Sequence, residues 1–261
     1  MQTFTLQHSG LLFSSALAAG ALNSVAGGGS FLSFPALLFT GVPPIQANAT
    51  NTMALWPGTL ASVGAYRREF ENDNRRMLTP LFITGIVGGV IGALTLLRTP
   101  QATFLRLVPY LLLAATILFA ASGPITSWVR EQTHTLRHRG ILWRVFAALI
   151  QLFIAIYIGF FGAGAGILML ALLAIMGVEG IHTMNAYKTL LATLCNGIAV
   201  LTFIWAGAIL WPQAVVMLIG AALGGYLGAH FAQKMDPGHV RYIVIVLGAG
   251  MSAYFFWKHG F

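Results

Sequence analysis

Long apolar runs constrain this chain more than any other feature of its sequence. Met77–Leu97, Ile141–Phe161 and Trp211–Ala232 are runs of this kind, with at most one Lys or Arg in each. A helix of roughly 20 apolar residues crosses the hydrocarbon core of a bilayer. Only 8% of the residues are charged, whereas soluble domains carry about 25%. The sequence therefore predicts an all-α polytopic membrane protein.

Polar or glycine-rich breaks separate ten apolar segments along the chain. The segments are Leu11–Val25, Phe31–Phe39, Ala47–Tyr66, Met77–Leu97, Phe104–Ala121, Ile141–Phe161, Ile167–Met176, Ala186–Ala206, Trp211–Ala232 and Val240–Trp257. The second and the seventh are too short to cross, because ten helical residues span only about 15 Å. We expect each of these two to be a short broken helix. It either pairs with its neighbour as a re-entrant hairpin or crosses as a thin helix.

The segments repeat along the chain. GGVIGA at Gly88–Ala93 recurs as GGYLGA at Gly224–Ala229, at an offset of 136 residues (224 − 88). LLFTGV at Leu37–Val42 corresponds to LAIMGV at Leu173–Val178 at the same offset. Self-similarity at a fixed offset indicates an internal repeat. We expect a first membrane repeat over residues 1–121, a charged linker over 122–142 and a second membrane repeat over 143–261.

The distribution of Lys and Arg predicts that the two repeats are inverted. Basic residues follow the third segment and lie between the halves, at Arg67, Arg68, Arg75, Arg76, Arg130, Arg137 and Arg139. The matching loop of the second half, residues 206–210, has none. Short basic loops stay in the cytoplasm, so both termini are expected outside. The net charge of +8 is thus better explained by membrane orientation than by binding to nucleic acid.

Glycines at three- and four-residue spacing lie in the fourth segment of each half. They are Gly85, Gly88, Gly89 and Gly92, and then Gly220, Gly224 and Gly228. This spacing puts them on one helix face and lets another helix approach closely. We interpret them as packing residues.

A glycine-rich break precedes each of the two short segments. The breaks are GGGS at Gly27–Ser30 and AGAG at Ala163–Gly166. A helix that starts after such a break presents unpaired N–H groups and a partial positive charge, which together bind oxyanions. Broken helices at matching places in two repeats mark the substrate site of many transporters. The candidate binding residues here are Gly27, Gly28, Gly29, Ser30, Gly164 and Gly166; the alternative is that these glycines serve only a turn and tight packing.

Three polar residues within apolar segments complete the candidate site. Asn51 and Lys188 occupy matching positions of the repeats, and Asn196 lies further along the eighth segment. A charged residue at membrane depth is costly and is a functional candidate by default, so Lys188 is expected to attract the anion or to carry a coupled proton. The alternative is that its ammonium reaches the membrane interface. Asn51 is expected to donate to anion oxygens rather than to cap a helix.

These motifs resemble those of the TauE/SafE family of sulfite and organosulfonate transporters. The resemblance rests on AGGGSF at Ala26–Phe31, GVPP at Gly41–Pro44 and ATN at Ala49–Asn51, with their second-half counterparts GAGAGIL and NAYKTL. It covers essentially the whole chain. It implies a multi-pass protein of the inner (plasma) membrane that exports a small sulfur-containing anion.

The function predicted from the sequence is therefore secondary transport of a small anion, most simply sulfite or an organosulfonate. A passive anion channel and a non-transporting membrane scaffold remain as alternatives. No phosphate-binding loop, metal-ligand cluster or nucleophile–base pair is present in the sequence. We therefore expect no catalytic residues, no metal, no cofactor and no nucleic-acid partner; the expected partners are the anion, the lipid bilayer and coupled protons.

Overall fold

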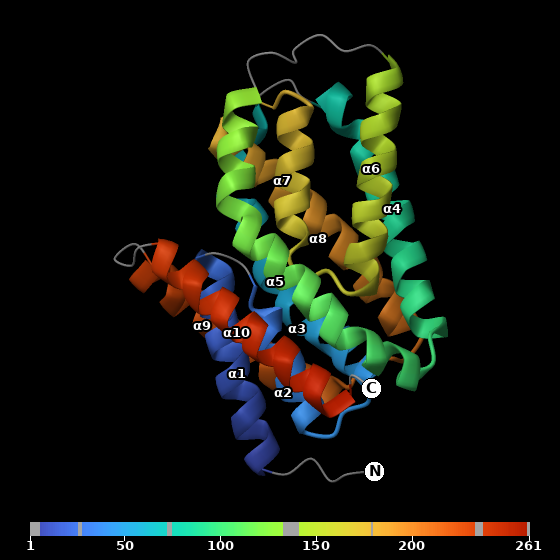
Figure 1. The fold of residues 1–261 in the computed structure, drawn as a ribbon, viewed down its shortest axis with the longest axis vertical. Coiled ribbons are helices and arrows are strands. Elements are labelled where there is room, and N and C mark those ends of the chain that lie inside the picture. The colour runs from blue at the N-terminus through green and yellow to red at the C-terminus, as the bar shows by residue number, and fades with distance from the viewer. Residues whose placement is uncertain are drawn as a thin grey trace. The chain divides into compact units, whose positions relative to one another are not determined.

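The computed structural model describes residues 6–25, 28–71, 75–132, 141–178, 180–232 and 237–259. These residues are almost entirely helical (Figure 1), and no strand occurs among them. The helices are α1 (Leu6–Val25), α2 (Ser30–Phe39), α3 (Pro44–Ala65), the 3-10 helix η1 (Arg67–Glu71), α4 (Arg75–Arg98), α5 (Gln101–Gln132), α6 (Ile141–Phe160), α7 (Ala165–Ile175), α8 (Ile181–Trp205), α9 (Trp211–Ala232) and α10 (Pro237–His259). The all-α prediction is confirmed.

Each of the ten predicted segments forms one α-helix. The largest difference in length concerns α5, which continues to Gln132, past the expected end at Ala121 and into the stretch expected to be a linker. This continuation carries Ile125, which packs against a buried apolar cluster. Side-chain burial stabilises a helix more than local propensity does, so α5 extends beyond the predicted end of its segment.

Five described helices are long and apolar enough to cross a membrane. They lie within α4, α5, α6, α8 and α9, and two shorter apolar helices are α2 and α7. A multi-pass membrane protein is thus confirmed. The inverted arrangement of the repeats and the position of the termini stay predictions.

The helices form two compact units, and each unit combines parts of both halves of the chain. The first unit comprises Met1–Gly58, Leu97–Ala120 and Phe203–Phe261, and the second comprises Thr59–Leu96 and Ala121–Thr202. The boundaries between units fall within α3, near the end of α4, and within α5 and α8. The division into repeats over residues 1–121 and 143–261, with a linker over 122–142, describes sequence similarity and stays a prediction.

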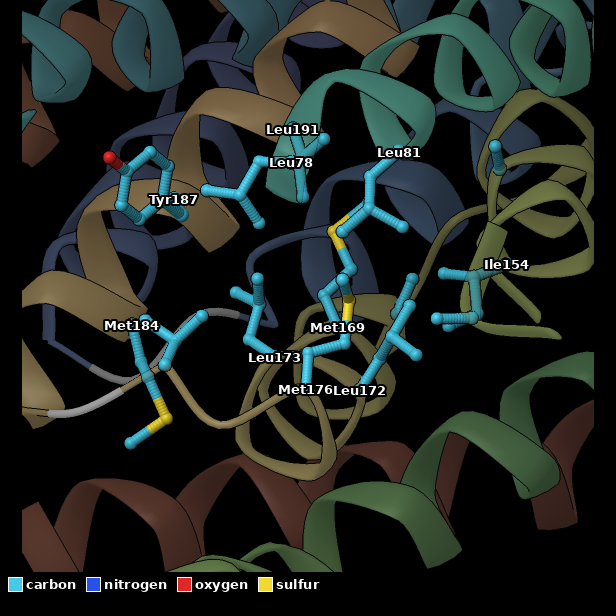
Figure 2. Packing of buried hydrophobic residues seen from close by; sticks show 14 of the residues in the cluster. Leu78, Leu81, Ile154, Met169, Leu172, Leu173, Met176, Met184, Tyr187 and Leu191 are labelled. Atoms are coloured by element: carbon cyan, nitrogen blue, oxygen red, sulfur yellow. The ribbon is translucent and has the colours of Figure 1, made fainter. Parts of the chain in front are cut away.

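The core of the second unit forms around the short helix α7. Met169, Leu172 and Leu173 of α7 are buried together with Leu78 and Leu81 of α4 (Figure 2). The cluster also draws on α6 and α8. A helix with apolar residues on all sides needs neighbours on all sides, which explains why a helix of only 11 residues is held firmly.

Glycines bring α4 against α6 within the second unit. A Cβ atom at Gly88 would lie 2.7 Å from the backbone oxygen of Leu152 and 2.6 Å from the Cβ of Ala155. A Cβ at Gly92 would clash with the backbone of Ile156. In the first unit, α1 packs along α9 through the corresponding glycines. The packing interpretation is confirmed for Gly88, Gly92, Gly220 and Gly224, and each contact joins helices from opposite halves of the chain.

The glycine contact of the first unit is equally close. A Cβ at Gly220 would lie 2.6 Å from the backbone oxygen of Phe13, and a Cβ at Gly224 would overlap the backbone of Leu17. Because these neighbours are backbone atoms, they have no side-chain freedom with which to move away. Glycine is therefore required at these two positions of α9.

We expect Gly224→Ala and Gly92→Ala each to lower the melting temperature of the purified protein. The added methyl group meets backbone atoms, and overpacking of this kind typically costs about 1–3 kcal/mol. Gly250→Ala is the matched control, because no atom lies within 4 Å of its Cβ position. It should leave the melting temperature unchanged or raise it, since alanine favours a helix. Equal melting temperatures for all three variants would contradict the close contacts.

Gln151 of α6 is a polar side chain within this apolar surrounding. It is fully buried, and neither its amide oxygen nor its amide nitrogen has a hydrogen-bond partner among the described residues. Its Nε2 lies 3.9 Å from the Cβ position of Gly85. A buried unpaired amide costs about 1–3 kcal/mol.

Gln151→Met is therefore expected to raise the melting temperature by a few degrees. Gln101→Met is the control, and it should lower the melting temperature. Gln101 accepts a hydrogen bond from the Ile45 amide at 3.0 Å and donates one to Gln46 at 2.7 Å, and the substitution removes both. A lower melting temperature for both variants would mean that the Gln151 amide has a partner in the folded protein.

Candidate functional site

The first glycine break lies between α1 and α2, in the first unit. Gly27 lies outside the described residues. Gly28 has a φ of 86°, a left-handed conformation that side chains rarely adopt. Its Cβ position is also only 2.8 Å from Val244 Cγ1 and 3.2 Å from Phe119 Cζ. Both backbone conformation and space therefore require glycine here.

The start of α2 is bonded by a side chain of α1. The Gly29 amide donates to Asn23 Oδ1 at 2.8 Å. The amide of Ser33 donates to the backbone oxygen of Gly29 at 3.2 Å. Asn23 thus bonds the amide of Gly29, the N-cap residue just before α2.

Ser30 and Asn51, both predicted from the sequence, are in contact. The Asn51 amide nitrogen donates to Ser30 Oγ at 3.3 Å, and its oxygen accepts from Ser33 Oγ at 2.5 Å. Ser33 and Asn51 are buried. The first break therefore carries a neutral, mutually bonded cluster of two hydroxyls and one amide.

The second break lies between α6 and α7, in the second unit. Gly162 and Gly164 have φ values of 78° and 75°, so the turn depends on glycine at both positions. The Tyr157 hydroxyl donates to the Ala163 oxygen at 2.6 Å, which fixes the turn. The amides of Ala165 and Ile167, at the start of α7, donate to the backbone oxygens of Gly162 and Gly164 at 3.3 and 3.1 Å. The N-cap residue, Gly164, has no side chain that could cap the helix.

Lys188 of α8 lies beside this helix start. The Cβ position of Gly166 is 3.5 Å from Lys188 Cδ, so the aliphatic part of the lysine lies against the first turn of α7. The ammonium donates to Asn185 Oδ1 at 2.9 Å. Within the described ranges, no carboxylate pairs with it. The second break therefore carries a positive charge whose described partner is a neutral amide.

The two breaks share one contact and differ in its chemistry. Asn51 contacts Ser30, and Lys188 contacts Gly166, which lies 136 positions after Ser30 (166 − 30). The equivalent side chain of the third helix of each half thus touches the first turn of the short helix. The counterpart of Ser33 is the apolar Met169. One break is therefore neutral and hydroxyl-rich, and the other is cationic.

Asn196 is the predicted residue that the structure does not join to a break. Its amide nitrogen donates to the Ala192 oxygen of the same helix at 2.9 Å. It lies about two helical turns beyond Lys188. Its role in binding stays a prediction.

Three contacting residues were missed by the sequence reasoning. Asn23 and Ser33 bond within the first break, and Asn185 bonds Lys188. Ser33 follows Ser30 by three positions and so shares its helix face, a spacing that would have found it. Asn185 corresponds to Asn48, which begins the NATN stretch of the first half. Asn23 has no such signal, because it belongs to the preceding helix.

Comparison with known proteins agrees with these features. The family model described as "Sulfite exporter TauE/SafE" matches residues 12–255. No solved structure matches the chain. Three bacterial relatives are each similar to this chain over most of the length of both proteins.

A "Probable membrane transporter protein" of Haemophilus influenzae is 28% identical over 96% of this chain and 95% of its own. A "Probable membrane transporter protein ORF9" of Sinorhizobium is 27% identical over 97% of this chain and 94% of its own. The "Probable membrane transporter protein YfcA" of Escherichia coli K12 is 30% identical over 94% of this chain and 88% of its own. An inner-membrane location is consistent with these bacterial relatives. The chain therefore belongs to the TauE/SafE family of membrane transporters, and the predicted resemblance is confirmed.

Proposed function

We propose that this protein is a secondary transporter that exports a small anion by alternating access. The proposed substrate is sulfite or an organosulfonate, which the description of the family supports. We also propose that the protein is not an enzyme and that anion movement is coupled to protons. The scarcity of other charged residues within the apolar helices motivates the coupling proposal.

The observation that carries this proposal is the Lys188 ammonium beside the start of α7. A cation and an uncapped helix N-terminus both favour negative charge. With Asn185 as its described partner, the ammonium has no fixed counter-ion in the described part of the protein. A mobile anion is the group that would neutralise it. In a low-dielectric surrounding this attraction is stronger than in water.

The first break offers a different kind of donor. Its hydroxyl and amide groups at Ser30, Ser33 and Asn51 are bonded to one another. Ser33 can donate to an oxyanion only by giving up its bonds, whereas the bond between Asn51 and Ser30 uses one amide hydrogen of Asn51 and leaves the Ser30 hydroxyl as the acceptor. We assign most of the affinity to the second break because it carries the charge of Lys188.

Lys188→Met is expected to abolish the stabilisation of the purified protein by its anion. Melting temperatures would be measured with sulfite, sulfate, thiosulfate, sulfoacetate, taurine, acetate and chloride at matched ionic strength and pH. A ligand at a hundred times its dissociation constant stabilises the folded state by about 2.7 kcal/mol. One sulfur oxyanion should raise the melting temperature of the unaltered protein in a saturable way, and of Lys188→Met not at all.

Lys258→Met provides the matched control for charge. Lys258 is exposed and donates to the Tyr254 hydroxyl on its own helix at 3.2 Å. Removing this charge should leave the response to the anion unchanged. If both lysine variants lose the response equally, the effect is general charge screening and the Lys188 site is wrong.

Gly166→Ala and Gly166→Leu test the contact between α7 and the lysine. The alanine Cβ would meet Lys188 Cδ at 3.5 Å, an ordinary contact, so Gly166→Ala should fold and respond to the anion nearly as the unaltered protein does. The larger leucine should displace the lysine and lower the apparent affinity by at least tenfold. A leucine variant that folds and binds normally would place the anion elsewhere.

A further inference from the structure

In each unit, one connection between helices docks beside a candidate site residue. In the second unit this connection is η1, between α3 and α4. Glu69 of η1 accepts a hydrogen bond from the Thr183 hydroxyl of α8 at 3.0 Å. The ring of Phe70 meets the ring of Tyr187 edge to face, at a centroid distance of 5.5 Å. Lys188 is the next residue along α8.

The first unit has a corresponding contact in the connection between α8 and α9, residues 206–210. The amide of Leu210 donates to Thr50 Oγ1 of α3 at 3.0 Å. Thr50 is buried, and Asn51 is the next residue. A connecting segment thus reaches the start of a site-bearing helix here as well.

These two contacts occupy matching positions of the repeats. Tyr187 follows Thr50 by 137 residues (187 − 50), and Lys188 follows Asn51 by the same number. In both units the connection lies between the third and fourth helices of one half, and it docks on the third helix of the other half. The two docks thus lie at equivalent helix positions and differ in chemistry, one built from a carboxylate and rings and one from a backbone amide.

We propose that the two connections are the gates of the transporter. η1 closes the Lys188 side through Glu69 and Phe70, and residues 206–210 close the Asn51 side through Leu210. Each described dock lies within about the first two turns of α8 or α3. Opening η1 takes Phe70 away from Tyr187 and from the buried cluster around α7, against which Phe70 packs. Glu69, Phe70 and Leu210 are positioning residues, because they act through α8 and α3 rather than on the anion. The inference rests on the proposed transport by alternating access.

Cross-linking tests each gate by itself. The chain has one cysteine, Cys195, so Cys195→Ala gives a background free of cysteine. Glu69→Cys with Thr183→Cys would join η1 to α8, and Leu210→Cys with Thr50→Cys would join the other pair. Because position 50 is buried, oxidation of the two cysteines to a disulfide, which needs no bulky reagent, should join each pair in most molecules. Transport of radiolabelled sulfite by proteoliposomes should then fall at least tenfold and return when the cross-link is cleaved.

Anion binding separates a locked gate from a damaged site. The cross-linked proteins should keep the anion-dependent rise in melting temperature, because the gate does not hold the anion. Each single-cysteine variant, treated in the same way, should transport normally. Undiminished transport by the joined proteins, or failure of the pairs to join, would overturn the proposal.

Two further outcomes are distinct from these. Loss of anion binding together with transport would make the connection part of the binding site, which also overturns the gate. If the unlinked background protein itself neither binds nor transports any anion in the panel, the proposed function fails, and with it the gate.

Discussion

The close contact of helix backbones through glycine is the interaction on which the rest of this structure depends. In water, apolar helices associate because burial removes them from solvent, but in lipid that advantage is absent and close packing takes its place. Gly88 and Gly92 let α4 approach α6, and Gly220 and Gly224 let α9 approach α1. The helices so held carry the groups that finish the breaks, namely Asn23 on α1 and Tyr157 on α6.

A break in a membrane helix leaves polar backbone groups that must be satisfied by the protein or by a ligand. The two breaks of this chain meet this requirement with different groups. At the first, Asn23 bonds the Gly29 amide, and Asn51 bonds two serines. At the second, the backbone oxygens of Gly162 and Gly164 accept from amides at the start of α7, and Lys188 lies beside its first turn. The two halves are therefore chemically unequal, because the lysine occurs at only one of the two breaks.

Sequence reasoning was most accurate where a single physical rule applied. Run length identified each helix, and glycine spacing identified the packing faces of α4 and α9, because both depend on residues within one helix. Ser30 and Asn51 were each predicted as candidate residues, but only the structure shows that they contact each other. The predicted end of the fifth segment was wrong, because the continuation of α5 depends on the packing of Ile125 against residues distant in sequence.

The amino-acid sequence by itself determined the membrane class, the order of the helices, the two glycine breaks and the presence of a lysine in an apolar segment. These follow from local composition, which acts within a turn or two of helix. Only the tertiary structure decided which helices meet. It assembled each unit from both halves of the chain, placed Lys188 against Gly166 and put Glu69 on α8. Such contacts join residues far apart in sequence, and their energies arise only when the whole unit packs.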